Sequence, residues 1–277
     1  MPDLSATDGV GIHYEVWGRR DRSPVLMIQG LGADSRSWAL QRVPFGRRHR
    51  CVAPDNRGTG RSEKPPGPYD LEQMAADAVA ALDAEGIDRA HVMGASMGGV
   101  IAQIVAVRYP ERVRSLTLAC TACRHHEWRR ELLAEWADEV TAHGMQSMAS
   151  DGLRWLVGPR LQRRFGMWIN VLARLILSMP PEPFVAQIRA ILDMTDDVRF
   201  ELHTIEVPTL IITGSQDALT PVGDAEEIAE MIPGSRLSIV SGAAHGVMAE
   251  APNAYNATVL DFIDEVDAAQ VPDTAAV

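Results

Sequence analysis

Short apolar runs alternate with helical patterns through most of the chain. Each run is apolar at successive positions, which is typical of strands that are buried on both faces. Helices between such runs supply the two covers that a parallel sheet needs. The runs are residues 25–29, 50–54, 90–93, 113–118, 208–213 and 236–240. Residues 10–17 alternate between apolar and polar positions more regularly than these runs do, which predicts an antiparallel edge strand.

The expected helices carry ordinary start and stop signals. A helix over residues 71–85 is followed by Gly86, and one over residues 97–109 precedes a proline. Thr220 precedes Pro221, so we expect Thr220 to cap a helix whose first residue is the proline. The alternation of strands and helices predicts an α/β fold, with a mostly parallel sheet and helices on both of its faces.

The strand signal disappears between about residues 124 and 203 and then returns. A first helical pattern covers residues 126–143 and a second covers residues 161–178; prolines follow, and then a shorter helix. We therefore predict that residues 124–203 form a helical lid. This lid is inserted into a core made of residues 1–123 and 204–277.

Composition narrows the function classes. The chain has 277 residues, of which 46% are hydrophobic, and its net charge is −11. Because an acidic chain repels phosphate backbones, nucleic acid is not an expected partner. No stretch approaches the ~20 apolar residues that span a bilayer, and we recognise no secretory signal. We therefore expect a cytoplasmic protein that acts on a small molecule away from the membrane, and the sequence leaves its oligomeric state open.

The three cysteines are Cys51, Cys120 and Cys123. Cys120 and Cys123 have the C-x-x-C spacing, but no second pair completes a zinc site. We expect buried, inert thiols and no metal centre.

Residues 94–99 read Gly-Ala-Ser-Met-Gly-Gly and fit the pattern G-x-S-x-G. The pattern follows a predicted strand and opens a predicted helix, which is the context that a nucleophile elbow requires. Small residues around the serine let the backbone pass closely, and the start of the helix directs amide hydrogens at developing negative charge. Ser96 is therefore the candidate nucleophile.

A serine hydroxyl is a weak nucleophile unless a base takes its proton and an acid orients that base. The chain order expected with this elbow is serine, then carboxylate, then histidine. His245 lies just past the last predicted strand, within residues 242–246, and is the expected base. Asp217 follows the preceding strand and is the expected acid. Asp224 is a weaker alternative because it falls inside the next predicted helix.

The remaining histidines near the predicted elements are given structural interpretations. His91 falls within a strand and is expected in the core or at an edge. His125 and His126 stand at the start of the predicted lid, where we expect them to face solvent, with a place in the pocket wall as the alternative.

The second oxyanion donor is expected from the loop after the first parallel strand, residues 29–33. Its glycines let the amide of Leu31 face the reacting carbon, while the amide of Met97 supplies the other donor. Gln29 and Gly30 are expected to border the substrate.

Together these residues resemble the α/β-hydrolase superfamily, and within it the lidded serine hydrolases. That group includes enol-lactonase-like esterases, methylesterases, carbon–carbon bond hydrolases and cofactor-free haloperoxidases. The resemblance covers nearly the whole chain and rests on residues 29–30, 55–62, 94–99, 208–217 and 242–245. It implies that residues 55–62 are a structural turn without chemistry.

Two positions refine the resemblance. The family most often has His-Gly in the oxyanion loop, whereas this chain has Gln29-Gly30, and glutamine still offers a donor and an acceptor. A serine at position 96, where epoxide hydrolases and haloalkane dehalogenases carry aspartate, argues against those two activities.

The main hypothesis is hydrolysis of a carboxylic ester or lactone through an acyl-enzyme, without a metal or organic cofactor. Alternatives with the same three residues are a cofactor-free haloperoxidase or perhydrolase and a carbon–carbon bond hydrolase. A binding module that has lost turnover is a further alternative. Aromatic and methionine residues in the predicted lid favour an apolar pocket for uncharged substrates of small to medium size, and Trp128 and Trp168 are expected to contact the substrate.

Overall fold

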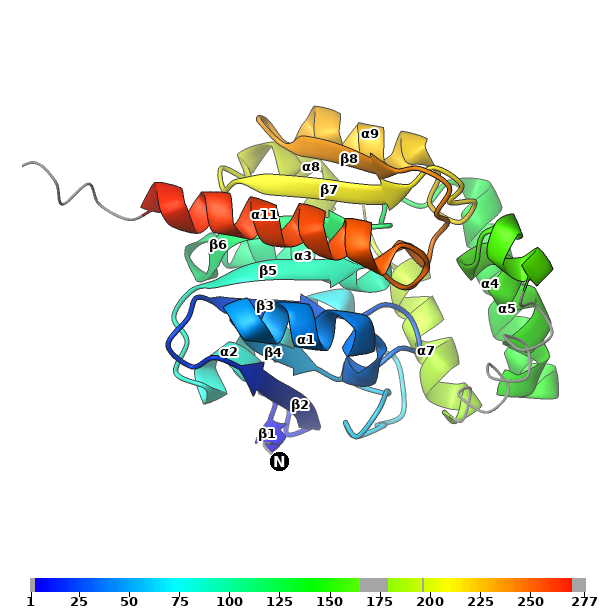
Figure 1. The fold of residues 1–277 in the computed structure, drawn as a ribbon. Coiled ribbons are helices and arrows are strands. Elements are labelled where there is room, and N and C mark those ends of the chain that lie inside the picture. Colours follow the sequence, from blue (N-terminus) through cyan, green and yellow to red (C-terminus); the bar gives the residue numbers. More distant parts are fainter. Residues whose placement is uncertain (1–2, 165–178, 196, 271–277) are drawn as a thin grey trace, which may run out of the picture.

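The computed structural model describes residues 3–164, 179–195 and 197–270 (Figure 1). Its centre is one sheet of eight strands in the order β1-β2-β4-β3-β5-β6-β7-β8. β2 runs antiparallel to both of its neighbours, β1 and β4, and the remaining pairs are parallel. The strands are β1 (Asp3–Ser5), β2 (Gly11–Gly18), β3 (Pro24–Ile28), β4 (Arg50–Pro54), β5 (Ala90–Ala95), β6 (Val113–Ala119), β7 (Thr209–Gly214) and β8 (Arg236–Val240).

Helices connect the parallel strands, as right-handed crossovers between such strands require. The described α-helices are α1 (Ala39–Arg48), α2 (Leu71–Ala84), α3 (Met97–Arg108), α4 (Glu127–His143), α5 (Met148–Leu156), α7 (Pro181–Leu192), α8 (Asp197–Glu201), α9 (Val222–Met231), α10 (Val247–Glu250) and α11 (Pro252–Gln270).

Successive residues of each central strand enter different cores. In β3, Leu26 and Ile28 pack in the core that includes α2 and α3, whereas Val25 and Met27 pack in the core that includes α1 and α11. Figure 1 shows α1 and α11 in front of the sheet, with α2 and α3 behind it. A strand that is covered on both faces must be apolar at every position, which explains the continuous apolar runs of the sequence.

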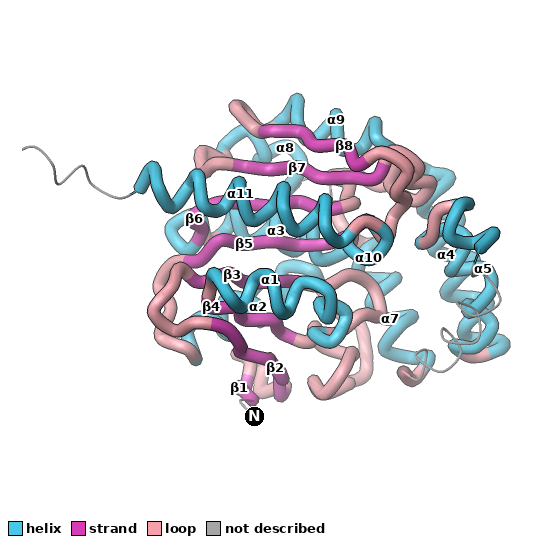
Figure 2. The backbone as a smooth tube through the Cα atoms, viewed as in Figure 1, coloured by secondary structure: helices cyan, strands magenta, loops and turns pink. Residues whose placement is uncertain are grey.

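The chain between β6 and β7 contains no strand among its described residues. It forms α4, α5, α7 and α8, and Figure 2 shows α4, α5 and α7 gathered beyond one end of the sheet. These features confirm the predicted α/β fold with a helical insertion. The limits of the lid at residues 124 and 203 stay a prediction, and most of the second predicted lid helix, residues 165–178, lies outside the described residues.

Two details differ from the sequence-based expectation. A short strand, β1, precedes the predicted edge strand and pairs with it, with Leu4 opposite Ile12. Helix α9 begins at Val222 with Pro221 as its N-cap, so Thr220 does not cap it. None of the described helices combines the length and the apolar character needed to cross a bilayer.

Candidate active site

Ser96 lies at the sharp turn between β5 and α3. Its φ and ψ are 55° and −122°, a conformation that non-glycine residues rarely adopt. The turn needs glycine at position 94, because a Cβ on Gly94 would lie 2.0 Å from the carbonyl oxygen of Gly98. The Ser96 N–H donates to the Ala119 carbonyl at 2.9 Å, and the Thr121 hydroxyl donates to the Ser96 carbonyl at 2.8 Å. Strand β6 and the residues after it therefore hold the strained serine in place.

His245 and Asp217 come from the loops after β8 and β7, and both lie beside Ser96. The Ser96 Oγ is 3.0 Å from Nε2 of His245, and Nδ1 of His245 is 2.9 Å from Oδ2 of Asp217. Because a carboxylate only accepts hydrogen bonds, Nδ1 carries the proton and Nε2 accepts from the Ser96 hydroxyl. Both His245 and Asp217 are buried. The structure thus brings the three residues predicted from sequence into one hydrogen-bonded chain, the arrangement that lets histidine take the proton of a serine.

Thr220 completes the surroundings of the Asp217 carboxylate. Its hydroxyl donates to Oδ2 of Asp217 at 2.8 Å and lies 3.2 Å from Nδ1 of His245. The backbone N–H groups of Leu219 and Thr220 donate to Oδ1 of Asp217 at 3.0 and 2.8 Å. Three donors from one short turn therefore fix the carboxylate, and this turn takes the place of the helix cap expected at Thr220.

Arg129 of α4 connects the helical insertion to this turn. Its side chain is 2% exposed, and its Nε donates to the Leu219 carbonyl at 2.8 Å. Its Nη2 forms an ion pair with Asp224, and a buried charge of this kind needs such a partner. Asp224, the weaker alternative for the acid, is therefore engaged with Arg129, whereas Asp217 is engaged with His245.

The loop after β3 packs directly against the serine. A Cβ on Gly30 would lie 3.0 Å from the Cβ of Ser96, so glycine permits this close approach. Leu31 and Met97 both line the same cavity as Ser96. Met97 is the first residue of α3, and its N–H has no acceptor within the helix. This geometry is compatible with the predicted pair of oxyanion donors.

Two buried side chains hold the shape of that loop. Nδ2 of Asn56 donates to the Gln29 carbonyl at 2.8 Å, and Oε1 of Gln187 accepts from the Gly32 N–H at 2.9 Å. The Gln29 side chain itself accepts from the adjacent Gly30 N–H at 3.3 Å. Asn56 and Gln187 therefore position the loop more firmly than Gln29 does. Asn56 belongs to the turn for which no chemistry was expected, although its position after the end of β4 is a typical one for functional side chains.

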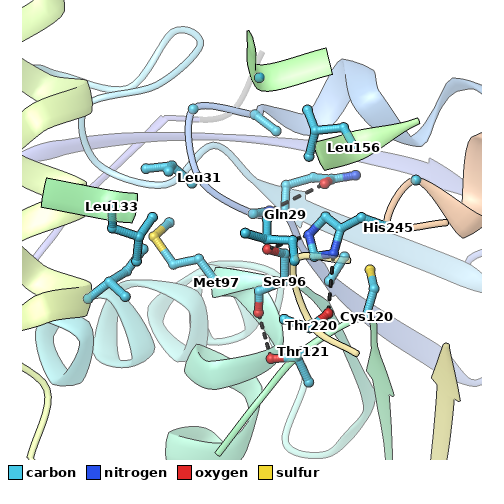
Figure 3. Close-up of a pocket in the computed structure, with 18 of the residues that line it drawn as sticks. Gln29, Leu31, Ser96, Met97, Cys120, Thr121, Leu133, Leu156, Thr220 and His245 are labelled. Atoms are coloured by element: carbon cyan, nitrogen blue, oxygen red, sulfur yellow. Dashed lines mark hydrogen bonds between the residues drawn. The ribbon is translucent and has the colours of Figure 1, made fainter. Parts of the chain in front are cut away.

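A cavity of about 470 Å³ opens beside Ser96 and His245, a volume in the range of small-molecule sites. Figure 3 shows Leu133 and Leu156 on different sides of Ser96 and His245. Most of the wall contributed by the helical insertion is apolar. It includes Leu133, Trp136, Met145, Met148, Leu156 and Phe184.

The residues predicted to contact the substrate differ in where they lie relative to the cavity. Gln29 and Gly30 line the cavity. Trp128 does not, which corrects the expectation: the residue is 40% exposed, and its ring stacks on Trp155 with ring centroids 6.3 Å apart. Trp168 lies outside the described residues. The buried face of α4 carries Arg129, Leu133, Trp136, Ala137 and Val140, and Trp128 is not part of it.

His125 also departs from the expectation. It lines the cavity, which was the alternative considered for it, and both of its ring nitrogens are buried. His91 is a buried residue of β5, as expected, and bonds Ser115 and Asp267.

A second polar cluster lies between α4 and α9. His126, Asp224 and Glu227 bring ligand atoms within 4.8 Å of one another. Both carboxylates already pair with guanidinium groups: Asp224 with Arg129, and Glu227 with Arg199 at 2.7 Å. The cluster is therefore an ion-pair network, because its carboxylates are already neutralised.

Comparisons with known proteins agree with this geometry. The sequence model of a family described as alpha/beta hydrolase fold matches residues 23–167, and one described as TAP-like protein matches residues 193–274. The RutD protein of Azorhizobium caulinodans, provisionally named a carbamate hydrolase, is 31% identical over 258 residues, which are 92% of this chain and 96% of RutD. The 3-oxoadipate enol-lactonase 2 of Acinetobacter baylyi is 30% identical over 260 residues, which are 92% of this chain and 94% of that enzyme.

A solved structure of an enol-lactonase has the same fold as this chain. The crystal structure of the enol-lactonase from Burkholderia xenovorans LB400 matches with a TM-score of 0.88 and 28% identity, over 95% of this chain and 100% of that one. With a family model that covers more than half of its length, and with relatives that share its whole fold, this chain belongs to the α/β-hydrolase family and is an enzyme of that family.

Proposed function

We propose that this enzyme is a serine hydrolase that cleaves an uncharged carboxylic ester or lactone through an acyl-enzyme. The observation that carries the proposal is the hydrogen-bonded chain from Asp217 through His245 to Ser96, which opens into an apolar cavity. A serine with a base and an oriented acid is the equipment for attack on an acyl carbon.

In the first half of the reaction, Oγ of Ser96 attacks the carbonyl carbon while Nε2 of His245 takes the hydroxyl proton. The carbonyl π electrons move onto oxygen and form an oxyanion. Collapse of this intermediate breaks the bond to the leaving oxygen, which receives the proton from Nε2. The alcohol leaves, or stays attached when the substrate is a lactone, and the acyl group remains on Ser96.

In the second half, water attacks the acyl carbon as His245 takes one of its protons. The second intermediate collapses, Ser96 leaves with the proton, and the carboxylic acid is released. Asp217 stabilises the imidazolium in both halves. The amides of Leu31 and Met97 are the proposed donors to each oxyanion, and such donors act strongly in a site that excludes water.

Two observations support the proposal: the first favours an uncharged substrate, and the second favours cleavage at the acyl carbon of an ester or lactone. The wall contributed by α4, α5 and α7 is mainly apolar, so it favours groups that lose little hydration on binding. The relatives carry names for the cleavage of a carbamate and of an enol-lactone. In both kinds of compound the acyl carbon is bonded to a heteroatom.

Labelling with a fluorophosphonate, followed by digestion and mass spectrometry, tests the nucleophile. The label is expected on Ser96 and absent from the Ser96→Ala variant. A kcat/KM series with p-nitrophenyl acetate, butyrate and hexanoate, p-nitrophenyl succinate and δ-valerolactone tests the substrate class. Each additional buried methylene is expected to raise kcat/KM about fourfold until the pocket is full, because burial of a methylene contributes ~0.8 kcal/mol.

Three outcomes would contradict the proposal: a label on another residue, a preference for acetate or succinate, or turnover confined to a carbon–carbon bond substrate. Peroxide-dependent halogenation that exceeds hydrolysis of every ester and lactone would favour the haloperoxidase alternative instead.

A further inference from the structure

The loop that carries His245 runs from the end of β8 to the start of α10. The core holds the beginning of this loop. The Gly242 N–H donates to Oγ of Ser215 at 2.9 Å, and the Ala243 carbonyl accepts from the Gln216 N–H at 2.8 Å. Ser215 and Gln216 directly follow β7, so these bonds fix only the residues before the histidine.

The residue after the histidine is bonded to the helical insertion. Gly246 donates its N–H to the carbonyl of Leu156 at 2.7 Å. Leu156 is the last residue of α5, and it also lines the cavity. Figure 2 shows α10, which begins directly after Gly246, at the same end of the sheet as α4 and α5. A hydrogen bond therefore joins the cavity wall to the backbone beside His245.

Glu250, the last residue of α10, connects the insertion to the residue before the histidine. Oε1 of its half-buried side chain accepts from the Ala244 N–H at 3.2 Å, and Oε2 accepts from the Gly158 N–H at 3.0 Å. Gly158 is buried and lies two residues beyond the end of α5. Hydrogen bonds from backbone N–H groups to an ionised carboxylate are stronger than those to a neutral acceptor. One carboxylate therefore bridges the insertion and the loop of the general base.

We propose that Glu250 is a positioning residue that holds His245 in line with Ser96. It acts on the backbone beside the histidine, because the ring nitrogens of His245 are bonded to Ser96 and Asp217. Small displacements of a catalytic group are costly in rate, so the contact between the insertion and this loop is a condition for full activity. The inference rests on the proposed function, in which His245 is the base.

Steady-state kinetics of Glu250 variants test the positioning role. Glu250→Ala removes both acceptor oxygens, so kcat is expected to fall about tenfold; KM should change less than about threefold, because Glu250 does not line the cavity. Glu250→Gln keeps the volume and one acceptor oxygen, and its kcat should lie between those of Glu250→Ala and the parent. Glu63→Ala is the matched control: it removes a carboxylate that accepts from the Gly11 N–H at 2.8 Å and does not line the cavity, so kcat should stay unaltered.

Gly158→Ala disturbs the same bridge from the insertion and retains the carboxylate, so it tests the inference even where Glu250→Ala does not fold. The backbone of Gly158 lies outside the left-handed region, which allows alanine, but the new Cβ would lie 2.8 Å from Oε2 of Glu250 and displace it. We expect kcat to fall, and the double variant to be little slower than Glu250→Ala because both changes break one connection. Gly223→Ala, whose Cβ would meet no atom within 4 Å, is the control and should leave kcat unaltered.

The rate at which a fluorophosphonate labels Ser96 gives a readout that needs no ester or lactone. It is expected to fall about tenfold in Glu250→Ala and to fall also in Gly158→Ala. Absence of the label from Ser96 in the parent enzyme would contradict the nucleophile of the proposed function, and the inference with it. With Ser96 labelled in the parent, three results would overturn the inference alone: equal labelling rates in the parent and the folded variants, a loss of kcat/KM that lies in KM alone, or losses that multiply in the double variant.

Discussion

The Thr220 hydroxyl donates a 2.8 Å hydrogen bond to Oδ2 of Asp217, the same oxygen that lies 2.9 Å from Nδ1 of His245. Thr220 therefore helps to fix the carboxylate that orients the histidine. The hydroxyl also lies 3.2 Å from Nδ1, where it can accept from the same N–H. We interpret Thr220 as a positioning residue for the proposed reaction.

Thr220→Val keeps the shape of the side chain and removes the donor, so it should lower kcat by about 10- to 100-fold, since hydrogen bonds to charged groups contribute ~1.5–3 kcal/mol. Thr220→Ser should recover most of the loss, and KM should change little because the hydroxyl is already engaged with Asp217. Steady-state kinetics of the two variants measure this. Equal kcat in Thr220→Val and the parent enzyme would refute the positioning role.

The shape of the oxyanion loop should depend more on Asn56 than on Gln29. Asn56→Ala removes the 2.8 Å hydrogen bond to the Gln29 carbonyl and should reduce kcat by about tenfold, because small displacements of oxyanion donors are costly. Gln29→Ala should reduce kcat less than about threefold, and Gln29→His should keep most activity. Tm values of all three variants separate loop geometry from global unfolding. The reverse ranking, with Gln29→Ala the more damaging, would contradict this account.

His49 should make the protein less stable in mild acid. Burial, with a contribution from His91, lowers the pKa of His49 to about 4. Between about pH 6.5 and pH 4 the unfolded chain holds a proton on this histidine that the folded chain does not. The free energy of unfolding therefore decreases as the pH falls through that window.

Urea unfolding at several pH values between about 4 and 7 measures the slope of the free energy of unfolding against pH. His49→Gln should flatten the slope in this window without removing it, because burial also lowers the pKa of His125, to about 3. Below about pH 4 the remaining slope should include Asp267; burial raises its pKa, but hydrogen bonds from His91 and Ser23 outweigh this and hold it at about 2. An unchanged slope between about pH 6.5 and pH 4 in His49→Gln would show that His49 does not cause the loss of stability in mild acid.

The cysteines should be unreactive in the folded protein. Cys51, Cys120 and Cys123 are all buried, and burial raises the pKa of Cys51 and Cys123 to about 12 and that of Cys120 well above its usual value. The thiolate is the reactive form, so a thiol reagent at about pH 8 should label none of them until the chain is unfolded. Rapid labelling of Cys120 or Cys123 in the native protein would revive a redox role for the C-x-x-C pair.

The elements that follow from local pattern were predictable from the sequence. A continuous apolar run identifies a strand that is buried on both faces, as in β3, where successive residues enter different cores. The elbow motif, together with a carboxylate and a histidine after late strands, led to Ser96, Asp217 and His245, because side chains at the carboxyl ends of parallel strands meet at one edge.

Features that depend on distant partners were not predictable in this way. Trp128 was expected at the substrate because it is an aromatic residue of the predicted lid, yet Arg129 takes the buried position because Asp224, 95 residues away, neutralises it there. Thr220 looked like a helix cap, since its bond to Asp217 depends on how the turn folds back on the carboxylate. Periodicity reports which face of a helix is apolar, but not which charge on another element makes a buried arginine favourable.

The most direct test of the proposed mechanism is a double-mutant comparison of Ser96 and His245 with the best ester or lactone substrate. Because the two residues act as one unit, Ser96→Ala and His245→Ala should each lower kcat by several orders of magnitude, and the double variant should be little worse than either. Purified proteins with Tm values close to that of the parent enzyme make the comparison valid. Losses that multiply in the double variant, or substantial kcat retained in either single variant, would contradict a serine nucleophile activated by this histidine.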